Sequence, residues 1–149
     1  MPAPENVELR FPADGGCFGC SADNVDGLQM SFRRRGNEIE AHYIVADRFH
    51  GAPGIVHGGI VATLLDEISC ALAVFVLDQH VVTGELTVRY ERPVPIEHGL
   101  VLRARVVDRS HPRYAEIAGE VCDGDVVLAR SRGKFFYVER DVEGAGSVP

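Results

Sequence analysis

One long apolar segment, HGGIVATLLDEISCALAVFVL at residues 57–77, limits most strongly what this chain can fold into. A glycine pair follows His57, and the apolar run is interrupted by Asp66 and Glu67. Its length and nearly continuous apolar character predict one buried helix. A carboxylate inside such a helix is costly unless it has a partner or a chemical role. Asp66 is therefore either a functional residue or a buried acid hydrogen-bonded to the backbone.

The same segment is nearly long enough to cross a membrane. Its apolar part, residues 60–77, comes close to the lower limit for a transmembrane helix. Asp66 and Glu67 at its middle each oppose insertion by roughly 2.5–3.5 kcal/mol, whereas an aliphatic side chain favours it by only about half a kcal/mol. We therefore expect the core helix of a soluble protein.

Size, charge and cysteine content exclude several classes of protein. The 149 residues correspond to one domain that can bury a sizeable core. A net charge of −7 argues against nucleic-acid binding, which needs a basic surface. The first residues lack the pattern of a signal peptide, and four cysteines are too few for a disulfide scaffold. We expect a cytoplasmic protein with neither a nucleic-acid nor a membrane partner.

Most of the remaining chain is predicted to form strands. Residues 28–35 and 38–45 predict a hairpin that turns at Gly36 and Asn37, and a glycine-rich loop covers residues 46–58. Alternation of apolar and polar residues predicts four later strands, at 83–92, 100–108, 115–122 and 126–138. Their outward charges are basic, basic, acidic and basic, so Arg and Glu can pair across the last three on a solvated face.

The order of these elements defines a fold class. Two strands, one helix and four strands predict an α+β domain in which a curved antiparallel sheet wraps around a single buried helix. The domain occupies the whole chain, and residues 1–16 and 140–149 are expected to be flexible tails.

Helical geometry places Asp66 on the face of the helix that carries small side chains. At 100° per residue, small side chains lie on the Asp66 side of the helix and bulkier ones on the other. We expect the bulky face to pack on the sheet and the small face to admit a second helix or a narrow ligand channel. The small residues are Ala62, Thr63, Ser69, Cys70 and Ala73, and the residues of the far face are Leu64, Ile68, Ala71 and Phe75.

The helix N-terminus suggests acyl chemistry. Glycines before a helix expose backbone N–H groups at the positive end of its dipole, where a developing oxyanion can bind. Gly59 and Asp66 share a face but are seven residues apart, roughly 10 Å along the axis. Reacting atoms must approach to about 3–3.5 Å. The two groups can therefore act together only if they come from different copies, which predicts at least a dimer.

Three segments carry a family resemblance. GAPGIVHGGIVATLLDE, VVTGELTVRYERPVP and CFGCSADNVDGL together closely resemble the PaaI-type acyl-CoA thioesterases of the hotdog-fold superfamily, over roughly residues 17–138. The resemblance implies a hotdog fold, a homodimer or homotetramer, and hydrolysis of an acyl-CoA substrate without a cofactor. It implies that Asp66 is the catalytic carboxylate, that the Gly58 N–H polarises the thioester carbonyl, and that Thr83 helps to place the water. It also implies that Asp66 and Gly58 of one site belong to different subunits.

The chain departs from this family at one position. Many relatives carry an amide side chain six residues before the histidine, where this chain has Gly51. His50 is the candidate to compensate. His57 is a candidate catalytic residue, and its place directly before the helix favours shaping the turn over acting as a base. Gly59, His50, Ala62, Ser69 and Ala73 are expected to contact the substrate, and the candidates for the CoA phosphates are Arg92, Arg109, Arg113 and Lys134.

Metal chemistry is not expected from the sequence. The six histidines show no ligand spacing such as HExxH. Cys17 and Cys20 form a lone CxxC without the second pair of ligands that a zinc site needs, which favours a structural role.

Two other functions stay open: a non-catalytic module that binds acyl thioesters, and a hotdog dehydratase or hydratase. The identity of the acyl group, and the choice between base and nucleophile for Asp66, are also open.

Overall fold

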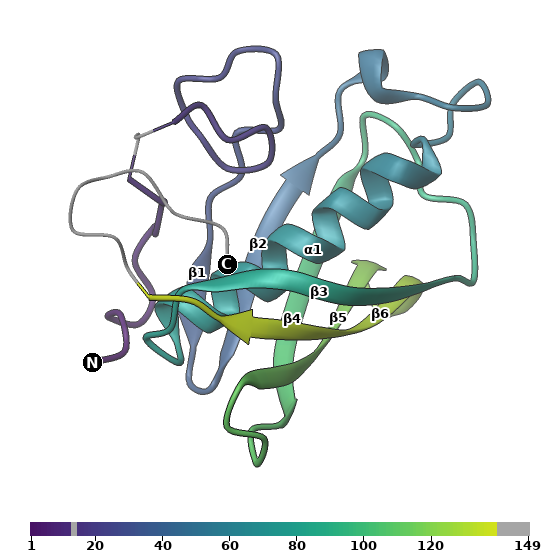
Figure 1. The fold of residues 1–149 in the computed structure, drawn as a ribbon. Coiled ribbons are helices and arrows are strands. Elements are labelled where there is room, and N and C mark those ends of the chain that lie inside the picture. Colours follow the sequence, from purple (N-terminus) through teal and green to yellow (C-terminus); the bar gives the residue numbers. More distant parts are fainter. Residues whose placement is uncertain (13–14, 140–149) are drawn as a thin grey trace.

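The computed structural model describes residues 1–12 and 15–139, which form a six-stranded antiparallel sheet around one long helix (Figure 1). The sheet order is β1-β2-β4-β5-β6-β3. Helix α1 spans Gly58–Phe75, and a short 3-10 turn, η1, spans Asp47–Phe49. The strands are β1 (Arg33–Arg35), β2 (Glu38–Ile44), β3 (Val81–Tyr90), β4 (Gly99–Asp108), β5 (Tyr114–Asp123) and β6 (Val126–Tyr137).

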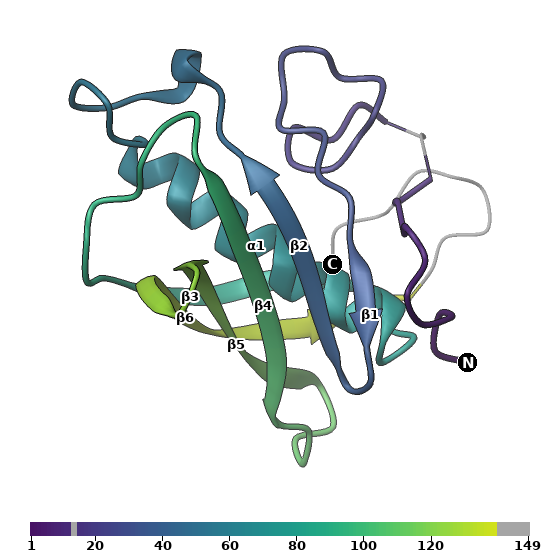
Figure 2. The same ribbon diagram turned by 180° about the vertical axis from the view of Figure 1, so that it is seen from behind.

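The sheet curves around α1, which contacts every strand from β2 to β6 (Figures 1 and 2). Leu64, Leu65, Ile68 and Leu72 are fully buried, and each contributes about 1.5–3 kcal/mol by leaving water. By length and composition α1 would also pass as a membrane span. Its packing against five strands instead matches the predicted core helix, and the predicted α+β architecture is confirmed.

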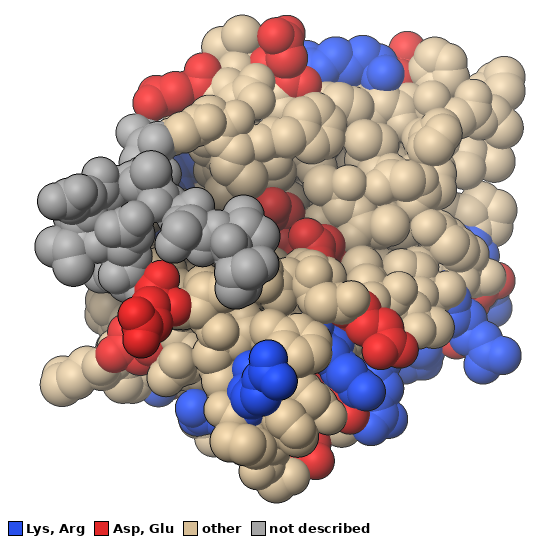
Figure 3. Space-filling model, in the orientation of Figure 1, with Lys and Arg blue, Asp and Glu red and all other residues tan. Residues whose placement is uncertain are grey.

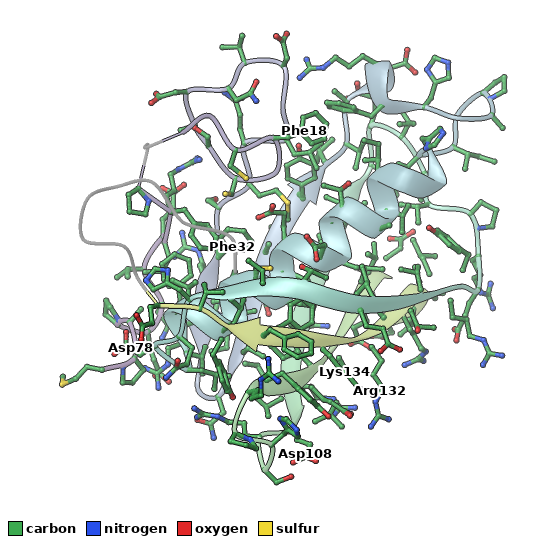
Figure 4. The ribbon with its side chains drawn as sticks, in the orientation of Figure 1. Phe18, Phe32, Asp78, Asp108, Arg132 and Lys134 are labelled. Atoms are coloured by element: carbon green, nitrogen blue, oxygen red, sulfur yellow. The ribbon has the colours of Figure 1, made fainter. Side chains whose placement is uncertain are left out.

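The outer face of the sheet carries the predicted ion pairs. Glu120 on β5 lies opposite Arg103 on β4 and Arg130 on β6, and its carboxylate is 3.6 Å from the Arg130 guanidinium. Arg132 binds Glu116 at 2.8 Å. Figure 4 shows Arg132 and Lys134 on the side of the sheet turned away from α1. Because the arginines are exposed and the glutamates only partly buried, each pair contributes little stability, about 0–1 kcal/mol.

The first predicted strand is shorter than expected. Residues 28–31 have the expected alternation, with Leu28 and Met30 buried, but they do not join the sheet. Their amides donate instead to backbone carbonyls of the loop that contains Cys17 and Cys20 (residues 17–20, the cysteine loop), from Leu28 to Phe18 and from Met30 to Gly19. Gln29 adopts a φ of 51°, which interrupts an extended chain. Leu28 and Met30 of this segment are therefore buried although the segment is not a strand of the sheet.

The N-terminal segment, predicted to be part of a tail, is bonded to the rest of the domain. Leu9 is buried and exchanges backbone hydrogen bonds with Phe32, at 2.7 and 2.9 Å. Glu5 forms a bridge with Arg34, and the Ala3 amide donates to the Phe75 carbonyl at the end of α1. Residues 1–12 therefore cover the β1 edge of the sheet. The other predicted tail, residues 140–149, lies outside the described residues.

The opposite edge of the sheet is open. β3 pairs with β6 on one side, and within residues 1–12 and 15–139 no strand pairs with its other side. Val82 and Tyr90 on this ten-residue strand are among the exposed large hydrophobic side chains. Long uncovered edges readily pair with another strand.

Candidate active site

Asp66 lies at the middle of α1 and faces β3. The Thr83 hydroxyl donates a 2.5 Å hydrogen bond to its Oδ1 atom, across the gap between helix and strand. The register of β3 against β6 shifts between Thr83 and Glu85, a β-bulge at the position that presents the hydroxyl to the helix. The Cys70 thiol is 3.8 Å from the same hydroxyl. The carboxylate is thus held in place from the open edge of the sheet.

The surroundings of Asp66 favour its neutral form. Burial raises the pKa of Asp66, and the Thr83 hydrogen bond opposes this by stabilising the charge. Figure 3 shows acidic atoms recessed in a hollow over α1, with uncharged surface above them, below them and to their right. A carboxylate with a raised pKa is a better proton acceptor than an ordinary aspartate, which suits a general base.

The two glycine amides at the N-terminus of α1 differ in their hydrogen bonding. His57 is the N-cap, and its Nδ1 atom accepts the Gly59 N–H at 2.9 Å. Gly59 was predicted to contact the substrate, but its amide is already occupied. The Gly58 N–H donates to no other described residue, so it is available at the positive end of the helix dipole. His57 therefore shapes the turn and leaves one free donor.

Tyr90 supports the Gly58 peptide and was missed by the sequence reasoning. Its hydroxyl donates to the Gly58 carbonyl at 2.6 Å and thereby ties the start of α1 to the end of β3. A side chain at position 58 would meet the Tyr90 ring at 3.6–3.7 Å. The alternation in β3 gave no signal of this contact, because the hydroxyl acts on a peptide 32 residues away.

One chain does not bring the donor and the carboxylate together. Gly58 and Asp66 are eight residues apart on the same straight helix, roughly 12 Å along its axis. A single carbonyl group cannot be polarised at one position and attacked at the other.

A groove opens beside Gly58. It has a volume of about 350 Å³ and lies between the start of α1 and the segment that follows β3. Among the four predicted phosphate ligands, Arg92 lines this groove. Arg109 and Arg113 both lie in the β4–β5 connection, and Lys134 lies 3.9 Å from Glu85 on the outer face. The four cations therefore do not gather in one place. The groove residues are Ile55, Val56, Gly58, Val61, Tyr90, Glu91, Arg92, Pro93 and Val94.

The loop before the helix places Gly51 against His57. A Cβ at position 51 would lie 3.2 Å from the His57 Cα, so position 51 adjoins the helix N-terminus. The His50 ring is hydrogen-bonded to the Asp47 carbonyl at 2.7 Å, within its own 3-10 turn. The Nδ1 atom of His50 is thus engaged within the loop, and a contact of this residue with the substrate stays a prediction.

The predicted small-residue channel is only partly open. Ala62 is half-buried, but Ser69 and Ala73 are fully buried. The Ser69 hydroxyl donates to the Leu65 carbonyl at 2.8 Å. A Cβ built on Gly119 of β5 would lie 3.5 Å from the oxygen of that hydroxyl. The expectation that Ser69 and Ala73 line a channel is therefore wrong for this chain. The curved sheet covers a wider arc of α1 than a flat one would, and the small residues allow β5 to approach closely.

Glu67 has a different environment from Asp66. Burial and the neighbouring Asp66 charge raise the pKa of Glu67, while hydrogen bonds from Cys17 and Cys20 lower it. The Cys17 thiol donates to Glu67 Oε1 at 3.5 Å. Figure 4 shows Phe18 of the same loop, whose ring meets Phe49 of η1 edge to face at 6.2 Å. Sequence reasoning found the cysteines but not their acidic neighbour.

The architecture has close counterparts among solved structures. The PaaI protein of Escherichia coli, from the phenylacetic acid degradation operon, superposes with a TM-score of 0.67 at 18% identity, covering 75% of this chain and 81% of that one. The predicted hotdog fold is therefore confirmed. A model of the thioesterase superfamily matches residues 53–130, just over half of the chain. The chain belongs to the thioesterase superfamily, as the PaaI-type resemblance predicted.

Two known proteins match parts of this chain by sequence. An acyl-coenzyme A thioesterase, THEM4 of Xenopus laevis, is 39% identical over 56 residues, which is 38% of this chain and 25% of that protein. An uncharacterized mitochondrial protein of Candida albicans (strain WO-1) is 27% identical over 104 residues, 69% of this chain and 46% of that protein. The chain thus matches less than half the length of either relative. Membership of the superfamily supports thioester hydrolysis in general.

Proposed function

We propose that this protein hydrolyses acyl-CoA thioesters to a carboxylic acid and free CoA. The observation that carries the proposal is the half-buried Asp66 carboxylate, held by Thr83 in the middle of the core helix. The superfamily membership and the sequence match to an acyl-coenzyme A thioesterase support the same reaction.

We further propose that two copies build the site. The uncovered edge of β3 is the surface on which a second copy pairs, and the Asp66–Thr83 contact lies along that edge. Pairing there would bring the Gly58 N–H of the second copy toward Asp66 of the first, which removes the separation of roughly 12 Å within one helix. A homodimer is then the smallest active unit, and a homotetramer is a pair of such dimers.

The reaction follows from these groups. As a general base, Asp66 takes a proton from water while the water oxygen attacks the thioester carbon. The Gly58 N–H binds the resulting oxyanion, and one such donor contributes about 2.7–4 kcal/mol. Collapse of the tetrahedral intermediate breaks the C–S bond, and the CoA thiolate recovers the proton from Asp66. As a nucleophile, Asp66 would attack the carbon itself, release the thiolate and form an anhydride that water then hydrolyses.

The experiment is thiol release from a panel of acyl-CoAs, with wild type and Asp66→Asn compared side by side. We expect the variant to lose at least about 100-fold, or roughly 2.7 kcal/mol of transition-state stabilisation. The panel also identifies the acyl class, aromatic or aliphatic. Absence of thiol release from every ester would overturn the hydrolase proposal.

Two alternatives give different results in the same assay. Conversion of enoyl or 3-hydroxyacyl thioesters without thiol release indicates a dehydratase or hydratase. Tight binding of CoA esters without turnover, unchanged in Asp66→Asn, indicates a binding module. The glycine at position 51, where relatives have an amide, is the feature that favours the binding module.

A further inference from the structure

The cysteine loop and the core helix bring three metal-binding side chains together. The Sγ atoms of Cys17 and Cys20 and a carboxylate oxygen of Glu67 all lie within 4.8 Å of one another. The CxxC pair alone offered two ligands, too few for a metal site. The third ligand is 47 residues beyond Cys20 in the chain and is supplied by α1, so no spacing rule could reveal it.

The loop is built to hold this arrangement. The Ser21 amide donates to the Cys17 carbonyl at 3.1 Å, which closes a turn that points both thiols the same way. The backbone of Phe18 and Gly19 is bound to that of residues 28–30. A Cβ at Gly19 would lie 2.3 Å from the Glu67 carboxylate, so the acid occupies the space that a side chain at position 19 would fill.

The three ligand types suit zinc. Zn²⁺ binds thiolate sulfur at about 2.3 Å and carboxylate oxygen at about 2.0–2.2 Å in a tetrahedron. These lengths require ligand atoms about 3.5–3.8 Å apart, so the observed cluster needs only a small contraction. Soft thiolates also discriminate against Mg²⁺ and Ca²⁺, which prefer oxygen ligands. Cys17 is exposed, which gives the ion a route of entry and leaves a fourth position for water.

We propose that Cys17, Cys20 and Glu67 bind one Zn²⁺ per chain, with water as the fourth ligand. Binding displaces the two thiol protons to solvent, and the two thiolates and the carboxylate around Zn²⁺ leave the site with a net charge of −1. The ion joins the cysteine loop to α1 at the residue next to Asp66. It is a structural ion that fixes one wall of the candidate active site, and its binding does not depend on which reaction that site performs.

The test uses the full chain, purified under reducing conditions without chelator. We expect about one zinc per chain by elemental mass spectrometry. Co²⁺ substituted for zinc should give the ligand-field bands of a tetrahedral site and a thiolate-to-metal charge-transfer band. Cys17→Ser, Cys20→Ser and the isosteric Glu67→Gln should each weaken Co²⁺ binding by at least about tenfold, because each removes a direct ligand.

Cys122→Ser is the matched control. Cys122 is also a buried, free cysteine, but it lies on β5 and outside the cluster, so its variant should bind Co²⁺ like wild type. Zinc should raise the Tm of wild type and of the control, and leave the Tm of Cys17→Ser unchanged. Circular dichroism shows whether each variant is folded.

Two results would overturn the proposal. One is a reduced wild-type chain that gives no thiolate–Co²⁺ band and no shift in Tm with zinc. The other is a Co²⁺ spectrum that survives in folded Cys17→Ser and Glu67→Gln. A Cys17–Cys20 disulfide in a chain that binds no metal after reduction would assign the pair to redox chemistry instead.

Discussion

The Thr83 hydroxyl and the Asp66 carboxylate are joined by a 2.5 Å hydrogen bond between strand β3 and helix α1. The bond matters because burial alone would push Asp66 toward its neutral form. A hydroxyl donor favours the charged carboxylate, which is the form that can take a proton or attack a carbonyl carbon. In the proposed reaction, Thr83 is thus a positioning residue for Asp66.

Replacing Thr83 with valine removes this donor without changing the shape of the side chain. A hydrogen bond to a charged group contributes about 1.5–3 kcal/mol. We therefore expect kcat for thiol release to fall by roughly 10- to 150-fold in Thr83→Val. Losing the bond also raises the pKa of Asp66, so the variant should recover part of its activity at higher pH, whereas a variant that is merely misfolded should not.

Thr87→Val is the control for this change. Thr87 lies four residues further along the same strand, opposite Arg132 of β6, and makes no hydrogen bond to Asp66. It should retain the wild-type rate and pH profile. Equal rates for Thr83→Val and wild type would show that the hydroxyl has no part in the reaction.

Tyr90→Phe tests the support of the Gly58 peptide, the proposed oxyanion donor. Its hydroxyl orients the Gly58 peptide from the carbonyl side, through a neutral hydrogen bond. Such bonds contribute about 0.5–1.5 kcal/mol, so we expect a two- to twelvefold drop in kcat, with KM little changed. Tyr114→Phe, which alters a ring stacked on His111 far from Gly58, is the control. A change confined to KM would instead place Tyr90 in substrate binding.

The sequence predicted the elements that depend on local periodicity. The nearly continuous apolar run of α1 and the alternation in β3–β6 are each visible within one element, so the helix and these four strands could be anticipated. The Arg–Glu pairs followed because neighbouring antiparallel strands place known residues opposite each other.

The features that escaped prediction depend on curvature and on contacts distant in sequence. Ser69 and Ala73 were expected on an open face, but the sheet wraps far enough around α1 to bury them. Tyr90 and Glu67 act on partners 32 and 50 residues away, where no pattern within a single element carries information. The glycine pair suggests a free N–H at Gly58. The hydrogen bond that occupies the Gly59 N–H depends on the side-chain conformation of His57, which the sequence does not show.

Glu40 makes the stability of the sheet sensitive to acid. Burial raises the pKa of Glu40, but His42 at 2.7 Å and Arg103 at 3.4 Å outweigh this and hold it below its ordinary value of 4.5. A depressed pKa means that the ionised acid stabilises the fold above its unfolded-state pKa. That contribution is lost as the pH falls through the lower folded-state pKa.

Urea unfolding between about pH 6 and pH 3 measures this contribution. The free energy of unfolding should fall more steeply with acid in wild type than in Glu40→Gln, and the two curves should converge at the acidic end. Glu38→Gln, on the same strand but exposed, should follow wild type. Parallel curves for wild type and Glu40→Gln would contradict the assignment.

A mixture of two inactive variants tests whether the site is shared between copies. Asp66→Asn removes the carboxylate. Gly58→Pro removes the N–H donor at the first position of α1, where proline is well tolerated because its fixed φ suits a helix start. Gly58→Ala, which keeps the N–H, should stay active and shows that loss of the amide, and not the added carbon, causes the defect.

Each variant alone should be inactive, whether or not the site is shared. In a mixed dimer with shared sites, one site combines both defects, while the other combines the intact Asp66 of one chain with the intact Gly58 of its partner. Half of the dimers in a random mixture are mixed, and each has one working site of two, so about one quarter of wild-type activity should return. If both groups of a site came from the same chain, every chain in the mixture would carry a defect and no activity would return. Recovery on mixing therefore separates the two arrangements by thiol release alone.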